Sequence, residues 1–167
     1  MNRTRLTFWV FVVGVAASVG QILMLGPLLP ERVASHFGPS GDADGFLSRD
    51  NFLLLQWGLT GFIGAFFVGL PWLLRITPPD AINLPNKDYW LAPERRVATL
   101  AFLDDRFFAL GAATLALMAA VMQQIYIANL GGSVSLGNIF WVYIAAYLIY
   151  TVVWTLTLTR RFSPPRS

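Results

Sequence analysis

One histidine and two aspartates lie close together between the first two apolar stretches of the sequence. His36 is the single histidine of the chain, and Asp42 and Asp44 follow it in the same connecting segment. Imidazole and carboxylate groups bind divalent metals and transfer protons, so one hypothesis is a loose metal site at these three residues. The alternative interpretation is a solvated turn, in which the aspartate side chains bind backbone amides.

The same segment partly matches the calcium-binding loop of an EF-hand. Asp42, Asp44 and Gly45 fit inner positions of that loop, but its two end positions would fall on Ser40 and Asn51. Neither end residue supplies the carboxylate that calcium requires there. We therefore do not expect an EF-hand, and we predict no cofactor.

A second group of polar and aromatic residues lies between the second and third apolar stretches. Pro93 followed by Glu94 is typical of the first turn of a helix, which we expect to continue into the third stretch. Acidic and basic residues nearly balance in this segment, which favours a folded cap over a loose linker. Its candidates for partner binding are Asn83, Pro85, Asn86, Tyr89, Trp90, Pro93, Glu94, Arg95 and Arg96.

Long stretches without charged side chains must position these two segments. Of the 167 residues, 56% are hydrophobic and 13% are charged, against roughly 25% charged in an average soluble domain. About 20 helical residues cross a hydrocarbon core of roughly 30 Å. We predict an all-α membrane protein of one domain, residues 1–167, with transmembrane helices at 6–29, 51–74, 107–130 and 139–158. The connections are then 30–50, 75–106 and 131–138.

The distribution of lysine and arginine predicts the orientation. Of the twelve basic residues, Arg32 and Arg49 alone lie on the side of connections 30–50 and 131–138. The positive-inside rule places that side outside the cell, with both termini and connection 75–106 in the cytoplasm. We therefore expect the bacterial cytoplasmic (inner) membrane. A cleaved signal peptide is the alternative for the first stretch, but its apolar run continues to Leu29, which favours an uncleaved anchor.

Several classes of function are not expected. The four stretches contain no ionisable Asp, Glu, Lys, Arg or His, which proton-coupled transporters and intramembrane hydrolases need. The basic residues flank apolar runs instead of forming one soluble face, so nucleic-acid binding is not expected.

Small and aromatic side chains suggest how the helices pack. Gly61, Ala65 and Gly69 in the second stretch, and Ala109 and Ala113 in the third, predict close approach of these two helices. The fourth stretch carries aromatic residues along one side, which we interpret either as a packing surface or as a groove for a lipid or peptide. These residues are Tyr143, Tyr147, Tyr150 and Trp154.

Two motifs resemble a bacterial membrane-domain family of unknown function, which also forms the N-terminal domain of SdpI-like toxin immunity proteins. The first motif comprises Leu29-Pro30, His36-Phe37, Gly41, Asp44-Gly45-Phe46 and Ser48-Arg49. The second comprises residues 83–90 and 92–96. The resemblance implies a membrane domain with an immunity-like or signalling-like role. The C-terminal domain of the full-length immunity proteins is not evident in the sequence.

The leading hypothesis is a non-enzymatic binding or accessory protein in contact with the lipid bilayer and with a peptide or membrane-protein partner. Binding would use the cap residues given above or an outer set, namely His36, Phe37, Asp44, Gly45, Ser48 and Arg49. The alternatives are a metal-assisted enzyme at His36 and Asp44 and a small oligomeric permease. The sequence does not predict the oligomeric state.

Overall fold

Four long helices make up most of the chain. The computed structural model describes residues 3–132 and 134–163, without the side chain of Arg3. Each long helix is long and apolar enough to cross a membrane, which confirms that part of the prediction. The long helices are α1 (Arg3–Leu25), α2 (Arg49–Ile76), α4 (Pro93–Leu130) and α5 (Ile139–Arg161), and the short ones are η1 (Gly26–Leu28), η2 (Pro79–Ala81) and α3 (Lys87–Trp90).

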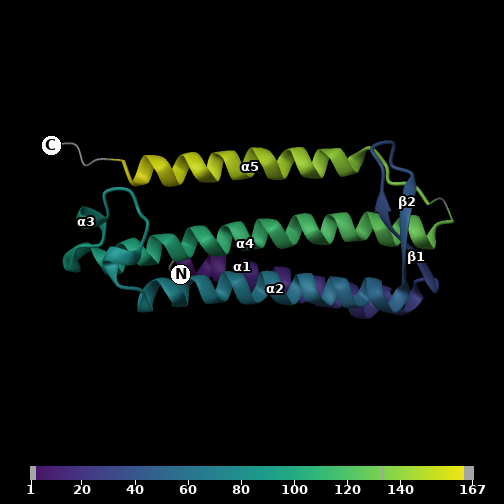
Figure 1. Cartoon of the computed structure of the whole chain (residues 1–167), viewed down its shortest axis with the longest axis horizontal. Coiled ribbons are helices and arrows are strands. Elements are labelled where there is room, and N and C mark those ends of the chain that lie inside the picture. The colour runs from purple at the N-terminus through teal and green to yellow at the C-terminus, as the bar shows by residue number, and fades with distance from the viewer. Residues whose placement is uncertain (1–2, 133, 164–167) are drawn as a thin grey trace.

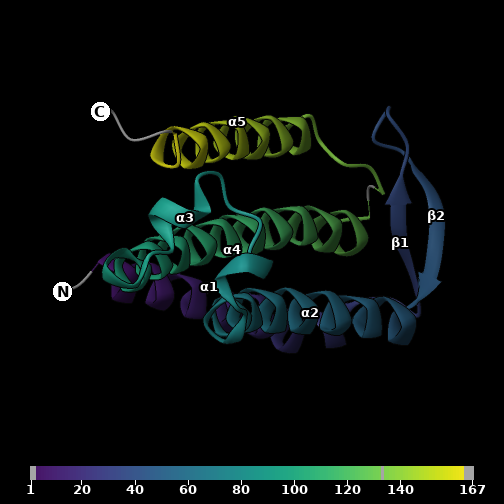
Figure 2. The same ribbon diagram turned by 60° about the vertical axis from the view of Figure 1, so that its left-hand side comes forward.

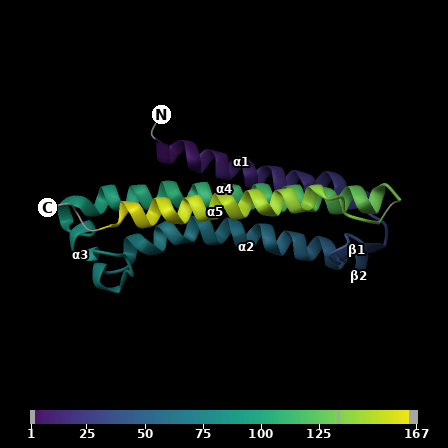
Figure 3. The ribbon, with the colours of Figure 1, turned by 90° about the horizontal axis from the view of Figure 1, so that it is seen from above.

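The helices form a three-membered bundle with a fourth helix outside it. α1, α2 and α4 pack together, and α5 lies along the opposite side of α4 (Figure 1). At one end, which we name the hairpin end, strands β1 (Arg32–Phe37) and β2 (Ala43–Ser48) run across the ends of the helices (Figure 2). The other end, the cap end, carries η2 and α3. The view from above shows α5 lying over α4, between α1 and α2 in projection (Figure 3).

Local sequence signals explain where the helices begin. The hydroxyl of Ser48 accepts a hydrogen bond from the amide of Asn51 at 3.3 Å and caps α2. Pro93 opens α4, with Glu94 in its first turn, as predicted. Because α4 has 38 residues, it is about 57 Å long and extends well beyond a hydrocarbon core.

The connection 30–50 is not the irregular turn that the all-α prediction assumed. It forms an antiparallel hairpin in which Val33 pairs with Leu47 and Ala34 with Phe46, and the register shifts around His36. The residues of β2 alternate between partial burial and exposure, as in a strand with one covered face. Such an isolated hairpin is only marginally stable in water, so its contacts with the helices determine its position.

The predicted packing of small residues between the second and third helices is wrong. A methyl group built on Gly58, Gly61, Gly64 or Gly69 of α2 would meet no atom within 4 Å. The bundle instead closes at Gly111 of α4, where an added Cβ would lie 2.7 Å from the ring of Phe67 and 2.9 Å from that of Phe11. Large rings of α1 and α2 pack against one small residue there, so the glycine stripe of α2 faces outward.

Candidate functional site

A side chain of α4 holds the hairpin on the bundle. The amide oxygen of Asn129 accepts the backbone N–H of Ala34 at 2.8 Å, and its NH₂ group donates to the carbonyl of Ala34 at 3.0 Å. The same NH₂ group donates to the carbonyl of Ile125 at 2.9 Å, which fixes the rotamer. Asn129 therefore binds β1 as the backbone of a neighbouring strand would, and Ala34 is buried beneath it.

The tip of the hairpin binds the connection between α4 and α5. The backbone N–H of Leu136 donates to the carbonyl of Gly41 at 2.8 Å, and Asp42 forms an isolated bridge with Ser135. Gly41 has a φ of 89°, and an added Cβ would lie 2.5 Å from the carbonyl oxygen of Leu136. Only glycine fits this turn, for both reasons. The hairpin therefore joins the start of α5 to the bundle.

His36 and Asp44 form a pair across the two strands. The Nδ1 atom of His36 lies 2.5 Å from Oδ1 of Asp44, and both side chains are exposed. An ionised carboxylate only accepts hydrogen bonds, so it holds the imidazole with its proton on Nδ1. Gly45 permits this arrangement, because an added Cβ would lie 2.8 Å from the Cβ of His36. The predicted residues His36, Asp44 and Gly45 thus form one unit.

A pocket of about 600 Å³ opens beside this pair; we name it the hairpin pocket. Its rim comes from the hairpin and includes His36, Phe37 and Asp44. Its apolar wall comes from α4, from the connection 131–138 and from the start of α5. That wall consists of Val121, Ile125, Leu136, Phe140, Trp141 and Ile144. Pockets of this size, apolar with a few polar groups, are typical of small-molecule sites.

The three candidate metal ligands are not brought together. Asp42 accepts a hydrogen bond from the hydroxyl of Ser40 at 3.0 Å and does not line the pocket. Among residues 3–132 and 134–163, no three His, Asp or Glu side chains gather as a metal site would require. The metal hypothesis therefore has at most the two ligands His36 and Asp44, one fewer than a zinc enzyme uses.

The other two outer candidates have structural contacts. Ser48 caps α2, as described above. The guanidinium of Arg49 donates to the carbonyl of Leu29 at 3.4 Å, and its backbone N–H donates to the carbonyl of Glu31 at 2.9 Å. Both residues therefore fix the two ends of the hairpin to α1 and α2, outside the hairpin pocket.

The inner candidates form a cap that holds the end of α5. The side chain of Asn86, in a left-handed backbone conformation, donates to the carbonyl of Phe162 at 2.8 Å. The ring of Trp90 packs edge-on against Phe162, and the guanidinium of Arg161 lies 4.2 Å from the centre of the Trp90 ring. Asn86 and Trp90 therefore explain part of the second motif as an attachment for α5.

The remaining cap candidates lie further from this attachment. Arg95 stacks over the Tyr89 ring at 4.0 Å and pairs with Glu94 at 2.8 Å. Arg96 donates to the carbonyls of Arg75 and Thr77, which ties the end of α2 to the start of α4. Asn83 and Pro85 are exposed. These residues form a folded cap, but none of them lines the hairpin pocket.

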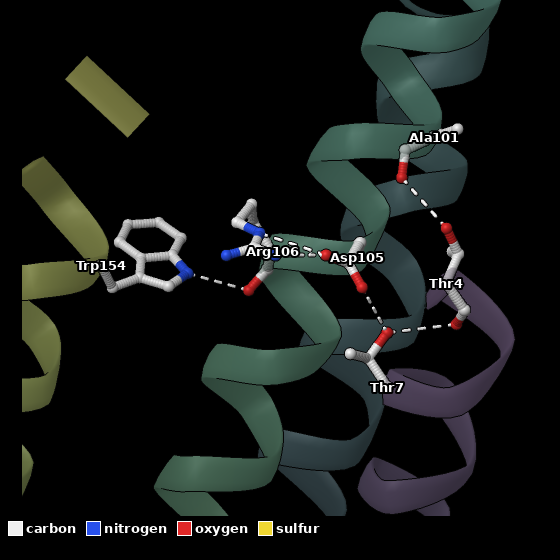
Figure 4. Close-up of polar contacts among 6 residues, drawn as sticks. All are labelled: Thr4, Thr7, Ala101, Asp105, Arg106 and Trp154. Atoms are coloured by element: carbon white, nitrogen blue, oxygen red, sulfur yellow. Dashed lines mark hydrogen bonds and ion pairs between the residues drawn. The ribbon is translucent and has the colours of Figure 1, made fainter. Parts of the chain in front are cut away.

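Sequence reasoning missed a set of buried charges near the cap end. Asp104 is buried and pairs with Arg75 of α2. Asp105 is also buried; it pairs with Arg106 at 2.5 Å and accepts the hydroxyl of Thr7 at 3.0 Å (Figure 4). The signal was present, because two adjacent acids stand one turn before an apolar stretch. In the sequence, the two acids contribute only to the nearly balanced charge of the segment 75–106.

The same region joins α5 to α4 (Figure 4). The indole N–H of Trp154 donates to the carbonyl of Arg106 at 2.9 Å. Further along α5, the hydroxyl of Tyr147 lies 2.8 Å from that of Thr114. The alanines of α4 thus face the aromatic side of α5. A hollow of about 280 Å³, which we name the seam hollow, remains between them. The aromatic stripe is therefore a packing surface, and its role as a groove for a lipid or peptide stays a prediction.

A network of neutral polar groups crosses the bundle beneath the hairpin. Gln21 of α1 donates to Gln123 of α4 at 2.9 Å, and Gln56 of α2 donates to Gln21 at 3.4 Å. The hydroxyl of Tyr126 donates to Gln56 at 2.7 Å, and both of these side chains are completely buried. Hydrogen bonds of this kind hold transmembrane helices in register. They therefore fix the position of α4, which supplies Val121 and Ile125 to the wall of the hairpin pocket.

Comparison with known proteins adds a partial assignment. No curated protein and no solved structure matches the chain. Residues 13–63, from within α1 through the hairpin into α2, match a domain of unknown function, DUF1648. The matched segment contains His36, Asp44 and Gly45. The chain is therefore a multi-pass, membrane-type helical protein, and the segment around its hairpin is similar to an uncharacterised domain.

Proposed function

We propose that the chain is a non-enzymatic binding protein of the bacterial cytoplasmic membrane, which holds an apolar or amphiphilic ligand in the hairpin pocket. The single observation that carries this proposal is the composition of the pocket. The pocket has a volume of about 600 Å³ and an apolar wall, and the exposed His36–Asp44 pair lies at its rim. Such a combination offers burial to an apolar group and directional contacts to a polar one.

The proposal places the hairpin pocket on the outer face. The hairpin end carries Arg32 and Arg49, whereas most basic residues lie at or beyond the cap end of the helices. This distribution supports cytoplasmic termini by the positive-inside rule. The resemblance of the first motif to the N-terminal domain of SdpI-like immunity proteins supports the same function. Binding at an outer pocket, transmitted through α5 to the cap, is a suitable basis for an immunity-like or signalling-like role.

A pocket-filling substitution tests the proposal. An added Cβ on Gly137, which lines the pocket, would meet no atom within 4 Å, so Gly137→Phe places a ring there without a backbone clash. The matched control is Gly58→Phe, because Gly58 on α2 is equally open and lies outside the pocket.

The measurement is affinity purification of each variant from native membranes in mild detergent, followed by mass spectrometry of the proteins and lipids recovered. We expect one co-purifying species to be lost from Gly137→Phe and retained by Gly58→Phe. Recovery of the same molecules, in the same amounts, from both variants would refute a ligand in this pocket.

One observation favours a second candidate function, a hydrolytic enzyme. The contact of Asp44 with Nδ1 leaves Nε2 of His36 free to accept a proton, as a general base requires. His36→Gln should then abolish hydrolysis of ester and phosphoester substrates by the purified protein, with or without added zinc. Equal rates for the wild type and this variant would exclude the enzyme.

A further inference from the structure

The hairpin pocket lies next to the seam hollow between α4 and α5. Val121 lines the pocket, and the preceding residue, Ala120, lines the seam hollow. On α5, Ile144 and Tyr143 divide between the two spaces in the same way. The two spaces are therefore neighbours along both helices, one at the hairpin and the other in the apolar part of the bundle.

The seam hollow needs an occupant of its own. It lies between alanines of α4 and tyrosines of α5, inside segments that cross the hydrocarbon core. Protein interiors are close-packed, and water is absent from the bilayer core. Among the long helices, α5 packs mainly against α4, and its described residues include no buried one, so the seam stands open to the bilayer. The surrounding bilayer supplies acyl chains, so the expected occupant of the seam hollow is a lipid acyl chain.

The rim of the hairpin pocket defines the headgroup. Among the described residues that line it, His36 and Asp44 are the only ones that can carry a charge, and no lysine or arginine is present. Within residues 3–132 and 134–163, no hydrogen bond reaches Nε2 of His36 or Oδ2 of Asp44. A carboxylate accepts hydrogen bonds from a primary ammonium group, and the imidazole of His36, when it carries a proton on Nε2 as well as on Nδ1, donates one to a phosphate.

We propose that the hairpin pocket and the seam hollow together hold one amine-bearing phospholipid of the outer leaflet, with its ammonium group on Asp44, its phosphate on His36 and an acyl chain between α4 and α5. This inference rests on the proposed function and names its ligand class. A quaternary ammonium headgroup carries the same charges but has no N–H to donate, and a glycerol headgroup has no cation.

The first experiment compares lipids on the wild-type protein. The delipidated protein is titrated with phosphatidylethanolamine, phosphatidylcholine or phosphatidylglycerol of identical chains, and native mass spectrometry counts the lipids retained. We expect one ethanolamine lipid to bind about 10-fold more tightly than the choline lipid, because it alone donates charge-assisted hydrogen bonds to Asp44. Equal retention of all three lipids, as for a general annular shell, would overturn the inference.

Substitutions locate the site. Asp44→Asn should remove the preference for ethanolamine over choline. Asp42→Asn should keep it, although the change in charge on the hairpin is the same, because Asp42 faces Ser40. Ala116→Phe should lower retention of every lipid by filling the hollow, whereas Val152→Phe, on the exposed side of α5, should not. Preference that persists in Asp44→Asn would overturn the headgroup assignment.

The two proposals fail differently. If Gly137→Phe displaces a molecule that is not an aminophospholipid, and the wild type shows no headgroup preference, the pocket binds a ligand and the lipid inference is wrong. If Gly137→Phe displaces nothing, both proposals are wrong. The comparison of ethanolamine with choline on the wild type needs no variant, so it decides the inference even if Asp44→Asn fails to fold.

Discussion

Replacing Asn129 by alanine should release the hairpin from the bundle. The Asn129 amide makes two hydrogen bonds to the backbone of Ala34, one in each direction, at 2.8 and 3.0 Å. Ala34 is 1% exposed, so water does not replace the lost partner without movement of β1. The hairpin is too short to hold its own position, and within the described residues the substitution removes its side-chain hydrogen bonds to α4, leaving the apolar contacts of Val33.

The expected magnitude follows from the two backbone groups that lose their partners. An unsatisfied buried donor or acceptor costs roughly 1–3 kcal/mol. With partial relaxation of β1 toward water, the two together amount to about 2–4 kcal/mol. A change of that size in the local opening free energy accelerates amide exchange by roughly 30- to 700-fold.

Hydrogen–deuterium exchange in detergent micelles measures this change directly. Peptides covering residues 31–48 should exchange faster in Asn129→Ala, while peptides from the middle of α1 should not change. Asn138→Ala is the matched control, because Asn138 makes no side-chain cap bond in the structure. Hairpin exchange that increases less than about 5-fold would contradict the reasoning, as would an equal increase in the control.

Three further changes have defined outcomes. Gly45→Ala forces a Cβ to within 2.8 Å of the Cβ of His36, so it should destabilise the hairpin by about 1–3 kcal/mol; unchanged exchange in residues 31–48 would contradict this. Tyr126→Phe removes the donor to buried Gln56 and should lower the free energy of unfolding in mixed detergent micelles by about 1–2 kcal/mol; no loss would show that the bond is dispensable. Because the chain has no cysteine, the Cys introduced by Ser40→Cys is the single thiol, and it should react with an impermeant maleimide in intact cells. Reaction only after lysis would show that the hairpin lies on the cytoplasmic side, opposite to the predicted orientation.

Charge-free length was enough to predict the four helices, since it alone distinguishes a membrane span from a buried soluble helix. Pro93 and Glu94 also marked the true start of α4. The hairpin was not predicted, because its strands are short and turn-forming residues (Gly38, Gly41, Asp42, Asp44 and Gly45) lie between them and at the start of β2. Its position depends on Asn129 and on the apolar cluster of Val33 with Ile125 and Tyr126, and no local sequence pattern predicts these distant contacts.

The sequence predicted several residues of the candidate site but not the pocket that they line. His36, Asp44 and Gly45 were recognised by type and spacing, and they do come together. The wall of the hairpin pocket, including Trp141 and Ile144, was not predicted, because it depends on where α5 lies relative to α4. The burial of Asp105 was not predicted, because its partner Thr7 comes from a distant part of the chain.

The hairpin pocket is divided unequally along the polypeptide. Its rim belongs to residues 13–63, the stretch that matches DUF1648, but its apolar wall comes from α4, the connection 131–138 and α5, later in the chain. A gene could keep the first portion unchanged and alter the second without disturbing the His36–Asp44 pair. Two proteins similar over this segment would then share the polar rim of the pocket but differ in the apolar wall, and so in the apolar groups that the pocket fits. A match to residues 13–63 alone therefore does not define the apolar wall of the hairpin pocket.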